Sequence, residues 1–465
     1  MVKAPKEPKS LYFIGIKGVA MAGLAVMAQQ LDYEVNGSDE ATVFPTDEML
    51  HRHKIIFHES FSAEHLKYKP DLVVISAAYG LTNSEVKAAK SLRLNVVTQS
   101  ELLGRFMVKF EGIGVSGVHG KTTTSSMLAY ILQQAGYSPS YSIGTGSVVG
   151  LEDSAHIGDG QYFVAEADEY RKSDLVMTPK FLDLPLQHVI ITSIELDHPD
   201  VYATAEQVYA AFYQLSIKIP RGGTIIACTD WPLVKRLVTR RVDRPCLTYG
   251  FDSSAEYQIT NFKEAKDVHF SIKKGDELVA DIALSLPGKH NALNATAAGL
   301  MAAKLGVSWA VIVKALGEFV GVKRRFEFLG EYNGAEFYDD YAHHPTALTY
   351  LLESAHRRFA GKRLVVVFQP HTYSRTGKLL KEFAQSLKTA DKLILLNIWA
   401  SAREKSGYVT IKDLIDEVKK YNPSVEYRPT LDELATYLKS FVTKGDVVLL
   451  VGAGDVYKIY DKISA

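Results

Sequence analysis

Cysteine is scarce in this sequence, with only Cys228 and Cys246 among 465 residues. The two residues have neither the spacing of metal ligands nor that of a redox motif, which excludes a disulfide framework and a cysteine-bound metal centre. An excess of charge of either sign is also missing, because 53 basic residues balance 53 acidic ones. A balanced chain has no global field that attracts nucleic acid or an acidic membrane. We therefore expect neither partner, and any anionic ligand must be bound by local groups.

Long apolar runs are lacking as well, since no stretch of about 18 uninterrupted apolar residues occurs, the length that spans a membrane. The basic residues 1–10, followed by the apolar residues 11–28, superficially resemble a secretory signal. However, Lys17 interrupts the apolar stretch, and three glycines there have the spacing of a strand, a tight turn and a helix. We therefore expect a cytoplasmic protein that does not cross a membrane.

What the sequence does contain is three successive series of apolar strand patterns that alternate with helix patterns. This alternation predicts an α/β protein built on parallel sheets. The chain is also too long for one core of ordinary size. We predict a Rossmann-like domain over residues 1–107, a central P-loop mononucleotide-binding domain over 108–322, and a Rossmann-like domain over 323–465. Short alternating strands over 256–284 predict a small antiparallel excursion from the central parallel sheet.

A glycine loop at residues 117–124, GVHGKTTT, is the strongest single motif and lies between an apolar strand and a helix. The backbone N–H groups of such a loop bind phosphate, a lysine adds positive charge, and a hydroxyl binds magnesium. Val115 stands where the strict pattern requires glycine. A glycine turn before a core helix is the alternative, but it leaves the GKTTT run unexplained. The candidate phosphate-binding residues are Gly117, His119, Gly120, Lys121, Thr122 and Thr123.

Acidic residues follow two further apolar strands, in VAEADEY and in IELDHPD. Magnesium prefers oxygen ligands and keeps several waters, so one or two carboxylates beside a nucleotide loop suffice. Taken alone, either cluster is more often surface charge or a helix cap. Beside a phosphate loop they favour a cation site, for which we select Thr122, Glu166 and His198.

A first glycine loop, GIKGVAMAG, contains Gly15, Lys17 and Gly18 and precedes Ser38 and Asp39 at the end of the next strand. The loop lacks the full dinucleotide fingerprint. An acidic residue at the end of the second strand can accept a hydrogen bond from a ribose hydroxyl. A structural turn and an NAD site both remain open on these residues alone.

Polar residues also cluster after apolar strands near the C-terminus, at 339–345, 368–376 and 452–455. Such groups are unfavourable when buried without partners, which favours a ligand crevice. A histidine pair by itself is usually a packing element. Arg375 and His343 together, however, provide donors suited to a carboxylate.

Motifs spread in order over nearly the whole chain resemble those of the Mur ligases of peptidoglycan synthesis. They read FIGIKGVAMAGLA, NGSD, GVHGKTTT, EADEYR, DHPD, LPGKHNALNA, GVKRRFE, DDYAHHP, FQPHTYSRT and GAGD. GVHGKTTT alone indicates only a wider superfamily that includes folylpolyglutamate synthases. DDYAHHP with QPHTYSRT narrows the resemblance to the branch that adds alanine.

This resemblance implies an ATP-dependent ligase that joins L-alanine to UDP-N-acetylmuramic acid through an acyl phosphate. It implies ATP and Mg²⁺ as cofactors, and we expect a monomer or a weak homodimer. The first domain would bind the UDP-sugar, the central domain ATP, and the last domain the amino acid.

The resemblance also implies roles for residues that match the family motifs. Lys121 and Thr122 match the phosphate and magnesium positions, and Glu166 and His198 match second-metal positions. Residues that match the nucleotide and amino-acid positions of the family are His290, Asn291, Arg325, Asp340, Tyr341, His343 and Arg375. The candidates for direct roles in catalysis are Lys121, His198, Arg325, His343 and Arg375.

Three departures from the family pattern stand out. The first loop reads GIKGVAM where GIGGIGM is common, so Lys17 could add a charge to diphosphate binding. Thr372 replaces a common arginine in QPHRYSRT. The stretch VYAAFYQL has no lysine for the carbamylation that sister ligases use, as expected for the alanine-adding branch.

Several alternatives stay open from the sequence. Within the ligases they are the recycling enzyme that attaches a tripeptide and a folylpolyglutamate synthase-like enzyme. From other classes they are a catalytically inactive nucleotide-binding module and an NAD-dependent sugar dehydrogenase. The second glycine loop disfavours the dehydrogenase.

Overall fold

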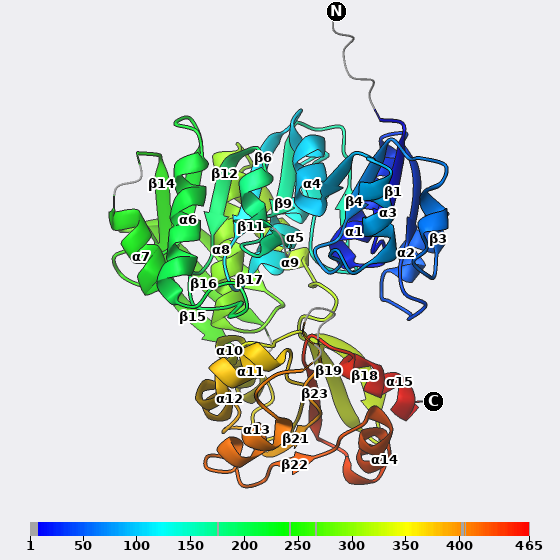
Figure 1. Cartoon of the computed structure of the whole chain (residues 1–465). Helices are drawn as coiled ribbons and strands as arrows, with labels where there is room; N and C mark the ends of the chain where they lie inside the picture. Colours follow the sequence, from blue (N-terminus) through cyan, green and yellow to red (C-terminus); the bar gives the residue numbers. More distant parts are fainter. Residues whose placement is uncertain are drawn as a thin grey trace, which may run out of the picture. The chain divides into compact units, whose positions relative to one another are not determined.

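The computed structural model of the chain describes residues 8–173, 176–240, 243–265, 267–400, 404 and 406–464. Three large sheets flanked by helices follow one another along the sequence, as the strand colours in Figure 1 show. The residues group into two compact units. The first comprises Met1–Glu195, Glu206–Gln258 and Asn294–Ala315, and the second comprises Leu196–Ala205, Ile259–Leu293 and Leu316–Ala465.

The first sheet is entirely parallel and has the order β3-β2-β1-β4-β5. This order, with β1 in the centre, is that of half a doubly wound nucleotide-binding fold. Its strands are β1 (Ser10–Ile14), β2 (Glu34–Ser38), β3 (Ile56–His58), β4 (Leu72–Ile75) and β5 (Val96–Thr98). Its helices are α1 (Val19–Gln30), α2 (Asp47–Arg52), the 3₁₀ helix Ala63–Leu66, α3 (Ser84–Ser91) and α4 (Gln99–Met107).

Helix α1 explains the apolar stretch near the N-terminus. All residues from Met21 to Ala28 are buried, because the helix packs against its own sheet, against α4 and against β8 (Ala155–His156). A helix buried on all sides is apolar all round. Residues 1–7 of the basic segment lie outside the described residues. Among the helices that the structure describes, none combines the length and apolar character needed to cross a membrane.

The second sheet is mostly parallel and contains the order β14-β13-β12-β6-β9-β7-β8, in which only the short β8 pairs antiparallel. These strands are β6 (Glu111–Ser116), β7 (Ser140–Ser142), β8, β9 (Tyr162–Glu166), β12 (Leu186–Ile191), β13 (Thr224–Cys228) and β14 (Cys246–Gly250). A separate hairpin consists of β10 (Arg171–Ser173) and β11 (Val176–Pro179), followed by the 3₁₀ helix Lys180–Asp183. The helices of this part of the chain are α5 (Lys121–Gln134), α6 (Ala205–Lys218), α7 (Pro232–Thr239), α8 (Lys289–Lys304) and α9 (Trp309–Glu318).

The predicted antiparallel excursion is present at one end of this sheet. Strand β15 (Tyr257–Glu264) begins parallel to β14, and β16 (Val268–Lys274) and β17 (Glu277–Leu284) form a hairpin beyond it. The hairpin turns at Gly275, whose φ of 58° is readily adopted by glycine. The prediction of a hairpin over residues 256–284 is therefore confirmed.

The third sheet has the order β18-β19-β23-β20-β21-β22 and is parallel except for β18. Its strands are β18 (Glu327–Tyr332), β19 (Ala335–Asp340), β20 (Leu364–Phe368), β21 (Lys392–Leu395), β22 (Glu426–Tyr427) and β23 (Val447–Val451). Its helices are α10 (Pro345–Arg358), α11 (Tyr373–Lys378), α12 (Leu380–Ser386), α13 (Ile411–Val418), α14 (Leu431–Phe441), the 3₁₀ helix Val456–Lys458 and α15 (Ile459–Ser464).

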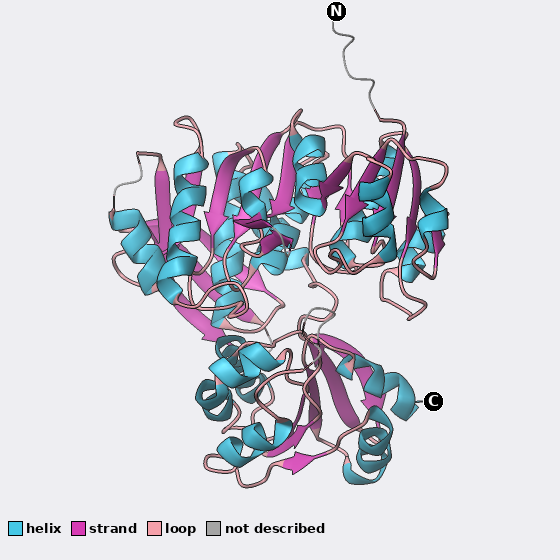
Figure 2. Cartoon of the chain, viewed as in Figure 1, coloured by secondary structure: helices cyan, strands magenta, loops and turns pink. Residues whose placement is uncertain are grey.

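Strand β20 shows why the third sheet needs helices on both faces, as Figure 2 illustrates. All five of its residues are buried. Leu364, Val366 and Phe368 join the apolar core beneath α10, α12 and α13, whereas Val365 and Val367 join the core beneath α14 and α15. Each such side chain contributes roughly 1.5–3 kcal/mol on burial. A charged residue at Val366 would therefore disrupt the domain.

Candidate active site

The glycine loop at residues 117–120 connects β6 to α5. Gly117 and Gly120 have φ angles of 138° and 82°, which L side chains rarely adopt. A Cβ atom at Gly117 would collide with Thr192 Oγ1, and one at Gly120 would collide with Asn294 Oδ1. The loop therefore requires glycine at both positions for conformation and for space.

Lys121 is the first residue of α5 and lies directly at this loop. Its ammonium donates to the Gly117 carbonyl at 2.7 Å and to the two carboxylate oxygens of Glu169 at 3.1 and 2.9 Å. Burial alone would lower the pKa of Lys121, but the carboxylates of Glu169 and Asp168 outweigh that effect and raise it. The loop therefore carries a protonated lysine at the N-terminus of a helix, which favours anions.

Oxygen atoms of the kind that bind metal ions lie in the same unit as this lysine. Strand β9 pairs with β6 in parallel, with Glu166 opposite Val115, so Glu166 lies at the sheet edge where the loop begins. Its carboxylate accepts a hydrogen bond from the Gly144 N–H at 2.7 Å. Thr122 is buried in the first turn of α5. A hydroxyl and a carboxylate are the kinds of ligand that Mg²⁺ prefers.

Two further candidate residues, one in the loop and one in α5, have different environments. His119 forms a hydrogen bond with Glu195 through Nε2, and its ring centroid lies 5.7 Å from that of Trp231. Thr123 is buried in the first turn of α5. His119 is therefore held by its side chain, while its backbone N–H donates to Ser193 Oγ at 2.8 Å.

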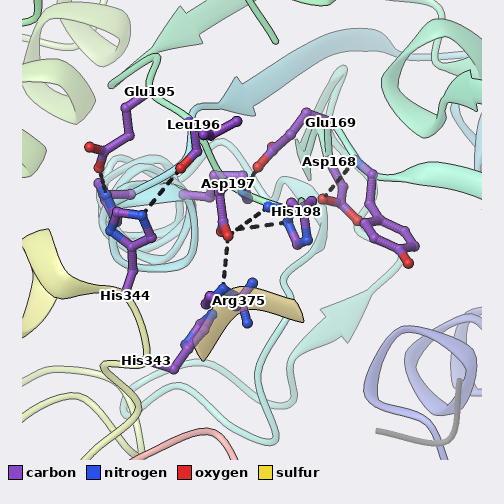
Figure 3. A network of polar contacts seen from close by, with 12 residues as sticks. Asp168, Glu169, Glu195, Leu196, Asp197, His198, His343, His344 and Arg375 are labelled. Carbon is purple, nitrogen blue, oxygen red and sulfur yellow. Dashed lines mark hydrogen bonds and ion pairs between the residues drawn. The ribbon is translucent and has the colours of Figure 1, made fainter. Parts of the chain in front are cut away.

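In the second unit, Arg375 is held by a buried carboxylate (Figure 3). Arg375 Nε donates to Asp197 Oδ1 at 2.9 Å, and Nη1 lies 3.1 Å from His371 Nδ1. Burial alone would raise the pKa of Asp197 and lower that of Arg375, but their mutual attraction reverses both shifts. Both groups are therefore ionised. His198 follows Asp197 in a left-handed conformation with a φ of 53°, and its N–H donates to Asp197 Oδ1 at 2.7 Å.

His343 lies close to this ion pair. Its Nδ1 is 2.8 Å from the Tyr341 carbonyl, and its ring lies edge-on to those of Tyr341 and His371. Burial, with the positive charge of Arg375, holds the pKa of His343 well below its usual value. A neutral imidazole next to a guanidinium can accept a proton or orient a polar ligand.

Arg325 lies just before β18, and Asp340 is the last residue of β19, the strand that pairs with β18. Asp340 accepts hydrogen bonds from the Phe326 N–H at 2.9 Å and the Ala342 N–H at 2.8 Å. Burial raises the pKa of Asp340, although the guanidinium of Arg325 opposes this shift. The guanidinium carbon of Arg325 lies 5.0 Å from the centre of the Tyr341 ring. These residues form one polar group in the second unit.

His290 and Asn291 begin helix α8 and also belong to the second unit. The His290 ring is stacked 5.9 Å from the Tyr350 ring. Asn291 Nδ2 donates to the Pro287 carbonyl at 2.7 Å. The amide therefore fixes the turn that precedes the helix.

The N-terminal glycine loop connects β1 to α1. Gly15 has a φ of 86°, and a Cβ there would lie 2.6 Å from the Tyr79 ring. Asp39 Oδ2 accepts from the Lys17 N–H at 2.8 Å, and Oδ1 accepts from the Tyr79 hydroxyl at 2.8 Å. Gly18, the N-cap of α1, has a φ of −61° that any residue adopts. The carboxylate of Asp39 therefore ties this loop to the end of β2.

The side chains of Lys17 and Ser38 also contact acidic groups. The ammonium of Lys17 lies 2.8 Å from Glu59 Oε1 and 3.5 Å from Asp47 Oδ2. The hydroxyl of Ser38 donates to the buried carboxylate of Glu85. Both side chains therefore already have polar partners within the protein.

Comparison with known proteins places all three parts of the chain in one group. Family models match residues 10–111 ("Mur ligase family, catalytic domain"), 115–302 ("Mur ligase middle domain") and 324–454 ("Mur ligase, glutamate ligase domain"). A UDP-N-acetylmuramate–L-alanine ligase of Desulfitobacterium hafniense is 38% identical over 455 residues, which are 97% of this chain and 98% of that protein. The chain belongs to the Mur ligase family.

Other Mur ligases support the same assignment. The UDP-N-acetylmuramate–L-alanine ligase of Carboxydothermus hydrogenoformans is 37% identical over 98% of this chain and 96% of its own length. The crystal structure of the UDP-N-acetylmuramate–alanine ligase of Thermotoga maritima has a TM-score of 0.82, at 25% identity over 98% of each chain. A murein peptide ligase of Psychrobacter arcticus has a TM-score of 0.77, at 26% identity over 98% of each chain. The three-domain α/β Mur ligase fold is therefore that of this protein.

The structure also shows contacts that the sequence did not single out. The sequence places Glu169 and Asp197 after predicted strands. Which acidic side chain faces a cation, however, depends on the turn that follows each strand. Arg324, beside Arg325, donates to Asp339 at 3.0 Å and to the Gly452 carbonyl at 2.8 Å. In the sequence, the run of basic residues KRR around Arg324 was the signal that could have pointed to this residue.

Proposed function

We propose that this Mur ligase is an ATP-dependent enzyme that joins L-alanine to UDP-N-acetylmuramic acid for peptidoglycan precursor synthesis. The observation that carries this proposal is similarity of 34–38% identity over nearly the whole chain to several proteins of that name. The protonated lysine at the glycine loop supports the ATP-dependent part of it.

We assign the three substrates to the three domains. Residues 1–107 would bind the UDP-sugar through Gly15, Gly18, Ser38 and Asp39, residues 108–322 would bind ATP, and residues 323–465 the amino acid. The limits follow breaks between elements: α4 ends at Met107 before β6, and α9 ends at Glu318 before β18.

The reaction consists of two transfers. A lactyl carboxylate oxygen of the sugar attacks the γ-phosphorus of ATP, a new P–O bond forms, and the bond to ADP breaks. The amine of alanine then attacks the acyl phosphate, an amide forms, and inorganic phosphate leaves after the amine loses a proton. Positioning and neutralisation of charge supply most of the catalysis of phosphoryl transfer.

The residues of the loop fit the first transfer. The loop residues Gly117, His119 and Gly120, with the N-terminus of α5 and Thr123, would bind the phosphates of ATP. Lys121 would neutralise the charge that develops on the transferred group. Lys121 would then redirect N–H donors from Glu169 to the phosphate, because one ammonium has three N–H donors to share.

Magnesium would supply further charge neutralisation on the phosphates when bound. The hydroxyl of Thr122 and the carboxylate of Glu166 suit this ion, since both offer oxygen ligands beside the loop. His198 belongs to the second unit, and its role as a metal ligand or proton acceptor stays a prediction.

The polar groups of the second unit fit the remaining contacts. Arg325, Asp340, His290 and Asn291 would contact ATP. Arg375 would bind the alanine carboxylate, and Tyr341 and His343 would contact the rest of the amino acid. A guanidinium has five N–H groups, and the contacts of Arg375 with Asp197 and His371 use two of them.

The decisive experiment measures phosphate release from ATP with magnesium and UDP-N-acetylmuramic acid. L-Alanine, the tripeptide L-alanyl-γ-D-glutamyl-meso-diaminopimelate and L-glutamate are supplied in separate reactions, and one reaction has no amino acid. We expect release with alanine and little with the other additions. Release only with the tripeptide would identify the recycling ligase, and release only when a folate replaces the nucleotide sugar and glutamate is supplied would identify the folate-type ligase. No release in any reaction would overturn the proposal.

A further inference from the structure

Lys17 is fully buried in the loop that connects β1 to α1 of the N-terminal domain. Its ammonium contacts Glu59 Oε1 at 2.8 Å, Asp47 Oδ2 at 3.5 Å and the Thr42 carbonyl at 3.2 Å. A buried ammonium is strongly unfavourable unless charges and hydrogen bonds compensate for the lost water. Here two carboxylates and a carbonyl provide that compensation.

Two aromatic rings complete the environment of the ammonium. The centres of the Phe44 and Phe57 rings lie 5.9 and 5.2 Å from Nζ, within the range of cation–π attraction. The ammonium is therefore surrounded by groups from residues 42–47, which end at the first residue of α2, and from residues 57–59, which follow that helix.

The backbone of Lys17 binds the same segment. Its N–H donates to Asp39 Oδ2 at 2.8 Å, and its carbonyl accepts a hydrogen bond from the hydroxyl of Thr46. We call residues 40–47 the strap. Lys17 thus contacts the strap, or the residue that precedes it, through its N–H, its carbonyl and its ammonium.

Charge balance argues against a direct contact between this ammonium and a diphosphate. Two carboxylates already face one positive charge, so a diphosphate at Nζ would be repelled by both. The hydrogen bond from Lys17 lowers the pKa of Glu59, which keeps that carboxylate ionised. The diphosphate would still have the N-terminus of α1 and the backbone of the loop.

We propose that Lys17 is a positioning residue that holds the strap against the glycine loop, so that the UDP part of the substrate is bound, and that it is not a diphosphate ligand. This inference rests on the proposed function, since it assumes that the UDP-sugar binds at this sheet edge. The lysine of GIKG would then hold the strap in place and would not bind phosphate. We call this role of Lys17 a clasp.

The variants Lys17→Met and Glu59→Gln distinguish two roles of Lys17, that of a clasp and that of a diphosphate ligand. If Lys17 is a clasp, each substitution loosens the strap, and KM for UDP-N-acetylmuramic acid rises about tenfold for Lys17→Met and less for Glu59→Gln. KM for ATP and kcat stay near those of the unaltered protein, and Lys17→Arg recovers part of the loss. If Lys17 is a diphosphate ligand, Glu59→Gln instead frees the ammonium and lowers that KM.

Binding of UDP and of uridine, measured by calorimetry, provides a second discrimination. A clasp predicts that Lys17→Met weakens both ligands by a similar factor, whereas a diphosphate ligand predicts a loss for UDP alone. A drop in KM for Glu59→Gln, a loss confined to UDP, or no change in either variant would overturn the inference.

Amide hydrogen exchange of residues 40–47 keeps the test independent of catalysis and of folding failures. We expect faster exchange in the strap for Glu59→Gln, whose side chain is half exposed and whose loss leaves the fold intact. Lys67→Met is the matched control, because Lys67 is an exposed lysine of the same domain that pairs with exposed Glu64. Unchanged exchange in both test variants would overturn the clasp even in a protein that releases phosphate normally. Absence of phosphate release by the unaltered protein would instead count against the proposed function alone.

Discussion

Two glycine loops of this protein carry a lysine after the first strand of a sheet, yet the two lysines have different surroundings. Lys121 is the first residue of α5, and its ammonium returns to the carbonyl of its own loop and to one carboxylate, Glu169. Lys17 precedes the N-cap of α1, and its ammonium points to two carboxylates and two aromatic rings of another segment.

This difference shows that a lysine in a glycine loop is not by itself evidence for phosphate binding. What matters is whether the ammonium lies beside the helix N-terminus, where the backbone also favours anions. By this criterion the central loop is the better phosphate site, and the N-terminal loop relies on its backbone.

The largest expected effect, and the strongest test of this comparison, is Lys121→Ala. We expect phosphate release to fall about 1000-fold or more, since charge neutralisation supplies much of the catalysis of phosphoryl transfer. The measurement is phosphate release with all three substrates, alongside the melting temperature. Lys109→Ala, at an exposed lysine just before β6, is the control and should keep full activity. Near-normal turnover of Lys121→Ala would remove the assignment of the loop.

The glycines give the next largest effect, now on stability. Gly117→Ala should lower the free energy of unfolding by about 2–4 kcal/mol, because the new Cβ meets Thr192 and the φ of 138° is strained. Gly18→Ala in the N-terminal loop should lose less than about 1 kcal/mol, since its φ is −61° and the added Cβ meets only ordinary contacts. Denaturant unfolding of both variants measures the contrast. Equal losses would show that the loops do not differ in backbone strain.

Arg375 extends the comparison to a third cation, which is buried. Arg375→Ala should raise KM for alanine about 100-fold and change KM for ATP much less, because it removes the donors for the amino-acid carboxylate. Asp197→Asn is the matched control, since it breaks the same ion pair but retains the guanidinium. Steady-state kinetics with each substrate varied in turn measure both. Similar changes for alanine and ATP would contradict the pocket assignment.

The smallest expected effect concerns the pH dependence of stability at His343. The folded protein keeps this imidazole neutral, with its pKa well below the usual value because of burial and of Arg375. The unfolded chain binds a proton there as the pH falls below about 6.5, so stability is lost in that direction. Between pH 7 and pH 5.5 we expect about 1 kcal/mol of such loss, which His343→Gln should abolish.

Thermal melting at the two pH values measures this difference. The fall in melting temperature should be smaller by about 2–4 °C in His343→Gln than in the unaltered protein. His269→Gln, at an exposed histidine, is the control and should leave the pH dependence unchanged. An identical fall in His343→Gln would show that His343 is not held neutral.

Much of the fold could be predicted from local patterns. The apolar runs that became β1, β4, β6, β20 and β23 are buried on both faces of parallel sheets, and such runs are readable in sequence. Short edge strands such as β3 and β22 were not predicted, because two or three exposed or partly exposed residues carry no periodic signal.

The site residues divide in the same way. Gly117, Gly120 and Lys121 follow from a motif whose chemistry depends on residues adjacent in the chain. The partner of each cation does not, because Glu59 lies 42 residues from Lys17 and Asp197 lies 178 residues from Arg375. No spacing rule connects such residues, since the turns after each strand decide which carboxylate reaches which charge.

The sequence by itself determined the alternation of strands and helices, the two glycine loops and the membership of the Mur ligases, because these depend on short-range periodicity and on motifs. Only the tertiary structure decided how the buried cations are neutralised and that His343 is held neutral. These properties depend on burial and on distances between charges far apart in the chain, since the energy of a charge in a protein is set by its neighbours in space.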